Sequence, residues 1–74
     1  MVSESRIDTL MLLMRMRMKK LPQNKVAKEL GMTTNTFQKK INNKSEFTIS
    51  EVAKLANMLD VPIDSSIFFR EERY

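Results

Sequence analysis

Apolar residues recur at intervals of three and four positions along most of the chain, a period that is typical of amphipathic helices. The pattern predicts four helices: one that begins after Ser5, a second over 22–30, a third between Thr33 and Asn42, and a fourth that begins after Thr48. Pro62 then stops the chain and can open a short fifth helix. We therefore expect an all-α fold, a compact bundle of four to five short helices.

Local signals mark most of these boundaries. Pro22 suits a first helical turn, because the amide hydrogen that proline lacks would be unpaired there anyway. Gly31 and Asn42-Asn43 follow the second and third helices, where a left-handed residue often closes a helix. Thr48-x-x-Glu51 has the spacing of a capping box. The expected inward residues of these three helices are Val26, Ala27, Leu30, Phe37, Ile41, Ile49, Val52, Leu55, Ala56 and Leu59.

The first helix has two competing apolar faces. Ser5 is its candidate N-cap, with Asp8 in the first turn. One face contains Ile7, Leu10, Met11, Met14 and Met18, and the residues alone do not decide which face is buried. The competing face contains Leu12, Leu13 and Met16. We expect the methionines to fill an irregular core, and a soft partner-binding surface is the alternative.

Length and composition exclude most enzyme classes. The 74 residues allow one domain, 1–74, which ends in a charged tail, 70–74, that we expect to fray. Cysteine and histidine are absent, so the usual thiol nucleophile, general base and soft metal ligands are missing. We expect no enzyme, no cofactor and no small-molecule ligand. No apolar run approaches the roughly 18 residues of a membrane span, so we expect a cytoplasmic protein with no membrane partner.

Charge is concentrated in the middle of the chain. Between residues 15 and 44 the only acid is Glu29, and the bases are Arg15, Arg17, Lys19, Lys20, Lys25, Lys28, Lys39, Lys40 and Lys44. The flanking segments together are net acidic. Such a directed field suits a polyanion on one face of the molecule, and a solvated lysine-rich surface is the plainer alternative.

The stretch TTNTFQKKINNK, residues 33–44, has only two apolar residues, Phe37 and Ile41. They lie four positions apart, so they dock a helix inward and leave hydroxyl, amide and ammonium groups outside. A very short turn at Gly31 joins this helix to the preceding one. Two short helices joined in this way cross steeply, as in a helix-turn-helix, whose second helix can enter the major groove of DNA.

These residues carry a family resemblance. LPQNKVAKELGMTTNTFQKKINNK resembles the phage repressor and Cro-like helix-turn-helix family, the lambda-repressor-like DNA-binding domains, with the motif at about 22–42. The stretch SEFTISEVAKLANMLDVPID is similar to the fourth helix of that family and its entry to a fifth. The resemblance covers roughly 21–69, and KINNKSEFTISE is similar to small regulators of Gram-positive phages.

The chain departs from the family at three motif positions. Pro22 stands where a capping Thr or Ser is usual, and Asn43 stands where glycine is usual. Ile41 stands where the family often has an acid that pairs with an arginine of the first helix. We expect an apolar contact with a methionine of the first helix in its place.

The resemblance implies roles for the outward residues of the third helix. The expected base readers are Thr34, Asn35, Gln38 and Lys39, because amides can pair with adenine, ammonium groups with guanine and a threonine methyl with thymine. In the family, the glutamine that opens the second helix binds a phosphate and braces the recognition helix. The expected phosphate contacts are Gln23, Thr33, Lys40, Asn42, Asn43 and Lys44.

The resemblance also implies a homodimer on a two-fold operator in double-stranded DNA. The possible dimer surface is Ile67, Phe68, Phe69 and Tyr74, although these residues are equally suited to the core. The expected function is therefore a sequence-specific transcriptional regulator. A protein-interaction module that keeps the fold without reading bases is the alternative. A peripheral membrane peptide would require a free apolar face on the first helix.

Overall fold

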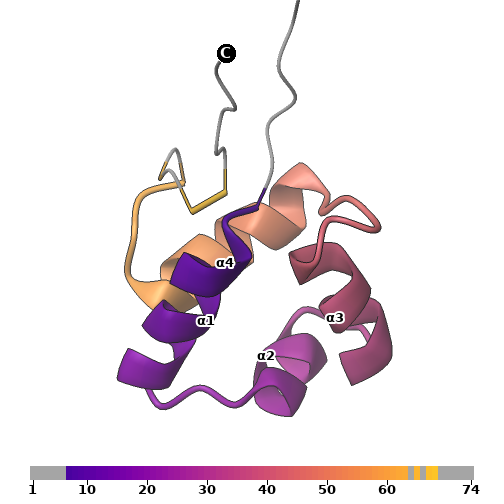
Figure 1. The fold of residues 1–74 in the computed structure, drawn as a ribbon, viewed down its shortest axis with the longest axis horizontal. Helices are drawn as coiled ribbons and strands as arrows, with labels where there is room; N and C mark the ends of the chain where they lie inside the picture. The colour runs from indigo at the N-terminus through magenta and orange to yellow at the C-terminus, as the bar shows by residue number, and fades with distance from the viewer. Residues whose placement is uncertain (1–6, 64, 66, 69–74) are drawn as a thin grey trace, which may run out of the picture.

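A computed structural model gives the fold and describes residues 7–63, 65, 67 and 68. In chain order its helices are α1 (Thr9–Met18), α2 (Gln23–Glu29), α3 (Thr34–Ile41) and α4 (Ile49–Leu59). Figure 1 shows α1 and α3 on opposite flanks, with α2 below and α4 above. The all-α prediction is confirmed, and the described part of the chain contains no strand.

The fifth helix is not found among the described residues. The chain there makes turns, in which Ser65 N–H donates to Pro62 O and Phe68 N–H donates to Ser65 O, each at 3.0 Å. Ile67 and Phe68 are 4% and 3% exposed and belong to the core. These two residues of the predicted dimer surface are therefore buried inside the subunit. Phe69, Tyr74 and the tail 70–74 lie outside the described residues.

Two of the helix beginnings follow their sequence signals. Thr33 Oγ1 accepts the Thr36 N–H at 3.1 Å, and Thr48 with Glu51 forms the full capping box. Pro22 makes no side-chain cap bond. The assignment of Asp8 to the first turn of α1 is wrong: Asp8 is itself the N-cap, with an extended backbone and a carboxylate that accepts from the Met11 amide.

The four helices of the described residues all end in the same way. The closing residue of each has a left-handed backbone, with φ of 57° at Lys20, 76° at Gly31, 64° at Asn43 and 58° at Asp60. The following amide then donates to the carbonyl five positions earlier, in the pairs Leu21–Met16, Met32–Ala27, Lys44–Lys39 and Val61–Ala56, at 2.9 to 3.0 Å. This arrangement is the Schellman motif, which satisfies carbonyls that the helix end would otherwise leave unpaired.

The core forms at the meeting point of the four helices and the C-terminal turns. Its least exposed large residues are Leu12, Val26, Phe37, Ile41, Leu55 and Leu59. The predicted inward faces of α2 and α3 are confirmed. On α4 one residue is wrong: Ile49 is 83% exposed, because it is the first residue of the helix and lies outside the apolar face that packs on the core.

The structure decides which of the two apolar faces of α1 is buried. Leu12 and Met16 are buried, whereas Leu10, Met11, Met14 and Met18 are 45–70% exposed. Polar side chains on either side of the buried face explain this rotation. Thr9 Oγ1 donates to Ile41 O at the end of α3, and Arg15 donates to Leu59 O at 3.2 Å and Asp60 O at 3.3 Å at the end of α4.

Replacing Gly31 by alanine is expected to destabilise the fold by about 1–2 kcal/mol, because a left-handed backbone brings Cβ against the next carbonyl. An added Cβ has nothing within 4 Å, so the loss comes from backbone strain alone. Urea unfolding measures the change. Lys20→Gly is the control at another left-handed position and is expected not to lower the midpoint. An alanine variant as stable as the parent would contradict this account.

Candidate nucleic-acid interface

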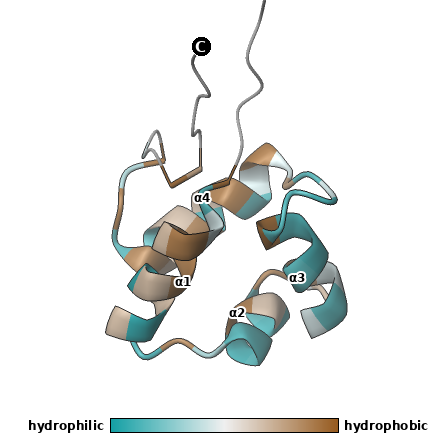
Figure 2. Cartoon of the chain, viewed as in Figure 1, coloured by the Kyte–Doolittle hydropathy of each residue, from teal (hydrophilic) through white to brown (hydrophobic). Residues whose placement is uncertain are grey.

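The outer face of α3 is polar along its whole length. Phe37 and Ile41 are 0% and 1% exposed, which fixes the rotation of the helix. Asn35, Gln38 and Lys39 are exposed on the opposite side, and Thr34 is half-buried. Figure 2 shows this helix largely hydrophilic at the outer edge of the fold. Its neighbour α2 packs against it after the turn at Gly31.

A hydrogen bond between two amide side chains ties α2 to the exposed face of α3. Gln38 Nε2 donates to Gln23 Oε1 at 3.1 Å. The bond leaves Gln38 Oε1 and one of its N–H groups unused, and it leaves both N–H groups of Gln23 unused. The brace that the resemblance implied for Gln23 is therefore present, and it holds Gln38 while leaving one acceptor and one donor of its amide for another partner.

The C-terminal end of α3 is fixed by asparagines. Asn42 Nδ2 donates to Gln38 O at 2.8 Å. The amide of Asn43 makes a two-point clasp with the backbone of Ile7, accepting from its N–H at 2.9 Å and donating to its C=O at 3.0 Å. Asn43 is thus both the left-handed residue of the helix end and the side chain that pins the start of α1. Its amide is occupied by the fold.

Lys44 is exceptional among the residues that follow a left-handed position. After the other three helices the corresponding residues are apolar, namely Leu21, Met32 and Val61, and all are partly buried against the core. This apolar contact usually accompanies the Schellman motif. Lys44 is instead exposed. The end of α3 therefore presents an ammonium group to solvent where the other helix ends present apolar side chains to the core.

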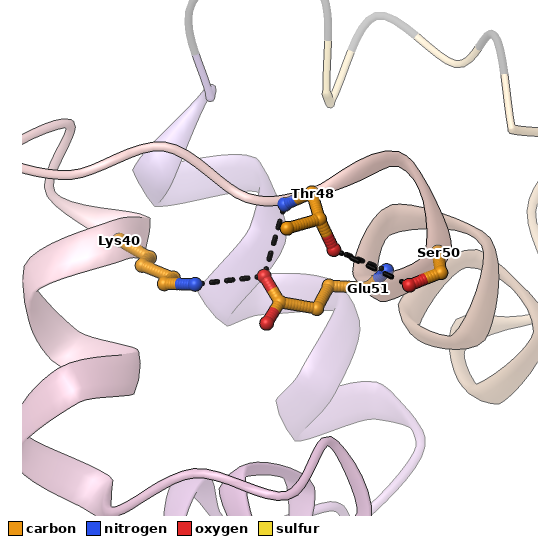
Figure 3. A network of polar contacts seen from close by, with 4 residues as sticks. All are labelled: Lys40, Thr48, Ser50 and Glu51. Atoms are coloured by element: carbon orange, nitrogen blue, oxygen red, sulfur yellow. Dashed lines mark hydrogen bonds and ion pairs between the residues drawn. The ribbon is translucent and has the colours of Figure 1, made fainter.

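Lys40 is held by α4, as Figure 3 shows. Its Nζ lies 2.7 Å from Glu51 Oε1, and the two side chains are only 13% and 20% exposed. The same oxygen accepts the Thr48 N–H at 2.9 Å. The ammonium also lies 5.8 Å from the ring centroid of Phe47, whose edge packs on Phe37. One carboxylate oxygen thereby joins α3 to the capping box of α4.

This network perturbs Glu51. Burial of the carboxyl group opposes ionisation, but the hydrogen bonds from Lys40 and from the Thr48 N–H outweigh it and lower the pKa of Glu51 from its ordinary value of 4.5. Lys40 was predicted to contact phosphate, and the structure places its ammonium in this ion pair instead. The capping-box spacing pointed to Glu51, but no sequence signal revealed that Glu51 and Phe47 would together hold Lys40.

The other predicted site residues fall into two groups. Asn35, Gln38, Lys39 and Lys44 are brought together on α3 and its C-terminal end, with polar groups open to solvent. The Thr33 hydroxyl caps the N-terminus of α3.

The described residues contain no group of three His, Cys, Asp or Glu side chains that could hold a metal ion. In the same part of the chain, no helix has the length and apolar character needed to span a membrane.

The geometry of α2 and α3 agrees with the comparison against known families. Residues 6–64 match the model of the Cro/C1-type HTH DNA-binding domain. The chain belongs to this family. The match spans all four helices, and it confirms the resemblance to repressor and Cro-like helix-turn-helix proteins. Searches of curated proteins and of solved structures gave no significant match.

Membership defines the general activity of the chain. A Cro/C1-type HTH domain binds DNA, and the family consists typically of regulators without a catalytic step. The two helices of the motif are α2 and α3, joined through the left-handed Gly31. Polar groups on the exposed face of α3 therefore lie on the second helix of the motif, which is the helix that enters the groove in such folds.

The Lys40–Glu51 pair is expected to make stability depend on pH. The pKa of Glu51 is lower in the folded state, so its contribution is present above 4.5 and is lost as pH falls through the folded value. Glu51→Gln keeps an acceptor for the capping box and removes the titration. The stability gap between parent and variant, measured by urea unfolding, should shrink as pH falls below 4.5. A gap that stays constant down to pH 3 would count against the pair.

Proposed function

We propose that this chain is a sequence-specific transcriptional regulator of the phage or prophage Cro/repressor type, which binds a two-fold operator in double-stranded DNA as a homodimer. It acts in the cytoplasm by occupying the operator and excluding polymerase or a rival repressor. The observation that carries the proposal is the brace from Gln23 to Gln38 at 3.1 Å. A side chain held in this way on an exposed helix face is preorganised for recognition.

Base reading falls to Thr34, Asn35, Gln38 and Lys39 in this proposal. Gln38 has an acceptor and a donor left over, and this pair matches N6 and N7 of adenine in the major groove. Asn35 lies one turn earlier on the same face and carries the same amide chemistry. Lys39 reaches guanine O6 and N7 or a phosphate, and the methyl group of Thr34 contacts a thymine methyl.

Phosphate contacts position the domain without reading sequence. Lys44 and the unused N–H groups of Gln23 are the strongest candidates, because they stand at opposite ends of the α2–α3 unit. Thr33 and Asn42, the exposed residues that cap the two ends of α3, add hydrogen-bonding groups. We leave Lys40 out of this set because Glu51 holds its ammonium, and we assign Asn43 only a backbone contact because Ile7 holds its amide.

A second function is favoured by one observation. The exposed methionines of α1 form an apolar surface that DNA binding does not use. A protein-interaction module, such as an antirepressor or an antitoxin, would use this surface. Neutralising Lys39 and Lys44 separates the two functions, since it abolishes DNA binding and leaves a partner bound through α1 unaffected.

Selection of bound sequences from a random duplex pool tests base reading. The parent protein is expected to enrich an inverted repeat. Gln38→Ala should relax the consensus at one position per half-site, because one bidentate contact is worth roughly 1–3 kcal/mol of discrimination. Gln23→Ala is the matched variant: it removes the brace but no base contact, so it should weaken binding with less change in the consensus.

An unchanged consensus in Gln38→Ala would remove this residue from the set of base readers. Enrichment of no sequence by the parent protein, with salt-sensitive general binding only, would overturn sequence-specific recognition and leave the protein-interaction module as the better function.

The salt dependence of binding tests the phosphate contacts. If Lys39 and Lys44 each neutralise one phosphate per subunit, the dimer should lose affinity with a log–log slope of roughly −4. Lys44→Ala removes one such contact per subunit, so its slope should be shallower by about 2 for the dimer. Lys54→Ala, an exposed lysine on α4, is the control and should keep the parent slope. A slope near zero for the parent would contradict the electrostatic account.

A further inference from the structure

The outer face of α1 is apolar and open to solvent, although the helix already buries its other apolar face in the core. Single exposed apolar residues are normal, but a contiguous group of them on one helix marks an interaction site. Unbranched methionine side chains adapt to partners of differing shape. The side chains of this outer face, which are 45% to 70% exposed, are Leu10, Met11, Met14 and Met18.

A groove lies beside this face, where the turn after α1 leads into α2. Its volume is about 510 Å³. Arg17 follows Met14 by three residues, so these two side chains are neighbours on the helix surface and join the groove to the outer face. We refer to the outer face and the groove together as the α1 surface. The groove is lined by apolar, cationic and amide side chains, which include Leu13, Met16, Leu21, Arg17, Lys20 and Gln23.

The charge of the α1 surface has one sign. From residue 9 to residue 28 the chain contains several bases and no acid. The fold uses Arg15, which donates to carbonyl groups at the end of α4, and Lys19, which lies 3.6 Å from an oxygen of Asp60. Arg17 and Lys20 are exposed in the groove lining, and no carboxylate of a described residue forms an ion pair with either. The complementary occupant therefore carries acidic groups beside apolar ones.

We propose that the α1 surface is the docking site for an acidic amphipathic helix of another protein. The apolar side chains of that helix cover Leu10 and Met14, and its carboxylates meet Arg17 and Lys20. Recognition of this kind uses apolar anchors at intervals of three and four residues. The exposed row from Leu10 to Met18 is about 12 Å long, at a rise of about 1.5 Å per residue, so a partner helix of about three turns covers it.

Other occupants fit this surface less well. The backbone of DNA would meet the cations, but it offers no apolar group to cover the leucine and the methionines. A second copy of this chain would bring Arg17 against a surface of the same charge, which is unfavourable. An anionic bilayer has no fixed side chains to fill a groove. A small molecule that filled the groove would leave the apolar row of α1 exposed.

The groove reaches the DNA-binding part of the fold through Gln23. This side chain lines the groove and also accepts the hydrogen bond from Gln38 on the exposed face of α3. An occupant that bonds the unused N–H groups of Gln23 removes a phosphate contact and disturbs the brace. Docking is therefore expected to weaken operator binding. This consequence rests on the proposed function, whereas the docking site itself does not.

A displayed library of random peptides of about 16 residues, enough for about four helical turns, tests docking when it is selected on the immobilised full chain. The selected peptides are expected to be net acidic, with apolar residues at helical spacing. Arg17→Glu should weaken a selected peptide at least about tenfold, because it replaces attraction by repulsion. Lys54→Glu makes the same change in net charge at an exposed position of α4 and should leave the affinity within about twofold.

The apolar half of the contact has its own matched pair of variants. Met14→Gln keeps the length and helix propensity of the side chain but removes its apolar contact, so a selected peptide should bind about fivefold more weakly. Ile49→Gln changes an apolar residue of α4 that is 83% exposed, and it should have no such effect. Lys44→Ala should also leave peptide affinity unchanged, since an acidic peptide that merely occupied the DNA-binding face would lose a contact there. All of these positions are exposed, and circular dichroism checks that each variant is folded.

Selection of no peptide, or only of peptides without acidic residues, would overturn the proposal. Equal losses of affinity in Arg17→Glu and Lys54→Glu would overturn it as well, because general charge attraction would then explain the binding. Self-association of the parent that Met14→Gln abolishes and a selected peptide does not inhibit would assign the surface to a second copy. Binding to vesicles of phosphatidylglycerol that Met14→Gln abolishes and a selected peptide does not inhibit would assign it to a membrane.

Operator binding separates the failure of this inference from the failure of the proposed function. A saturating selected peptide should lower the affinity of the parent for a duplex with one half-site at least about fivefold. A peptide that binds and leaves DNA affinity unchanged would overturn the antagonism and retain the docking site. If the parent binds no duplex, the proposed function fails, and the peptide affinities of the matched variants still decide the docking site.

Discussion

The burial of Phe37 is the contact on which the rest of the candidate site depends. Its ring is fully enclosed, and with Ile41 one turn later it fixes both the position and the rotation of α3. Because side chains follow a period of 3.6 residues, fixing two of them inward settles which groups face outward. The brace from Gln23 to Gln38 and the exposure of Lys39 both follow from that single docking. The Gln38 amide faces outward because the Phe37 ring beside it faces the core.

The basic charge of the chain serves the fold as well as the site. Arg15 donates hydrogen bonds to carbonyl groups at the end of α4. The Lys40 ammonium forms a largely buried ion pair with Glu51. Breaking this buried pair would leave a charged group with little access to water, which is costly. The Lys40 ammonium is therefore not free to bind a ligand. On α3 and the residues that close its C-terminal end, the cations open to solvent are Lys39 and Lys44. Counting bases along the sequence therefore overstates the charge available at one end of the domain.

The helix ends show how a short chain with one glycine builds tight turns. Among the residues that the structure describes, three of the four left-handed positions are occupied by Lys20, Asn43 and Asp60, and each accepts backbone strain that glycine would avoid. At Asn43 the side chain compensates by clasping Ile7. The same residue thus ends α3 and attaches the segment that leads into α1, which couples the candidate interface to the first helix.

The sequence by itself determined the four helices, the capping box at Thr48, the turn at Gly31 and the inward face of α3. Each of these depends on residues within one or two turns of one another, so local chemistry is sufficient. Only the tertiary structure decided the rotation of α1, because that helix is apolar on both faces and its own pattern does not distinguish them. The choice came from Thr9 and Arg15, which bond to residues more than thirty positions away. The same holds for the ion pair of Lys40 and for the burial of Ile67 and Phe68. Each depends on contacts with residues that are distant in the sequence and close in the fold.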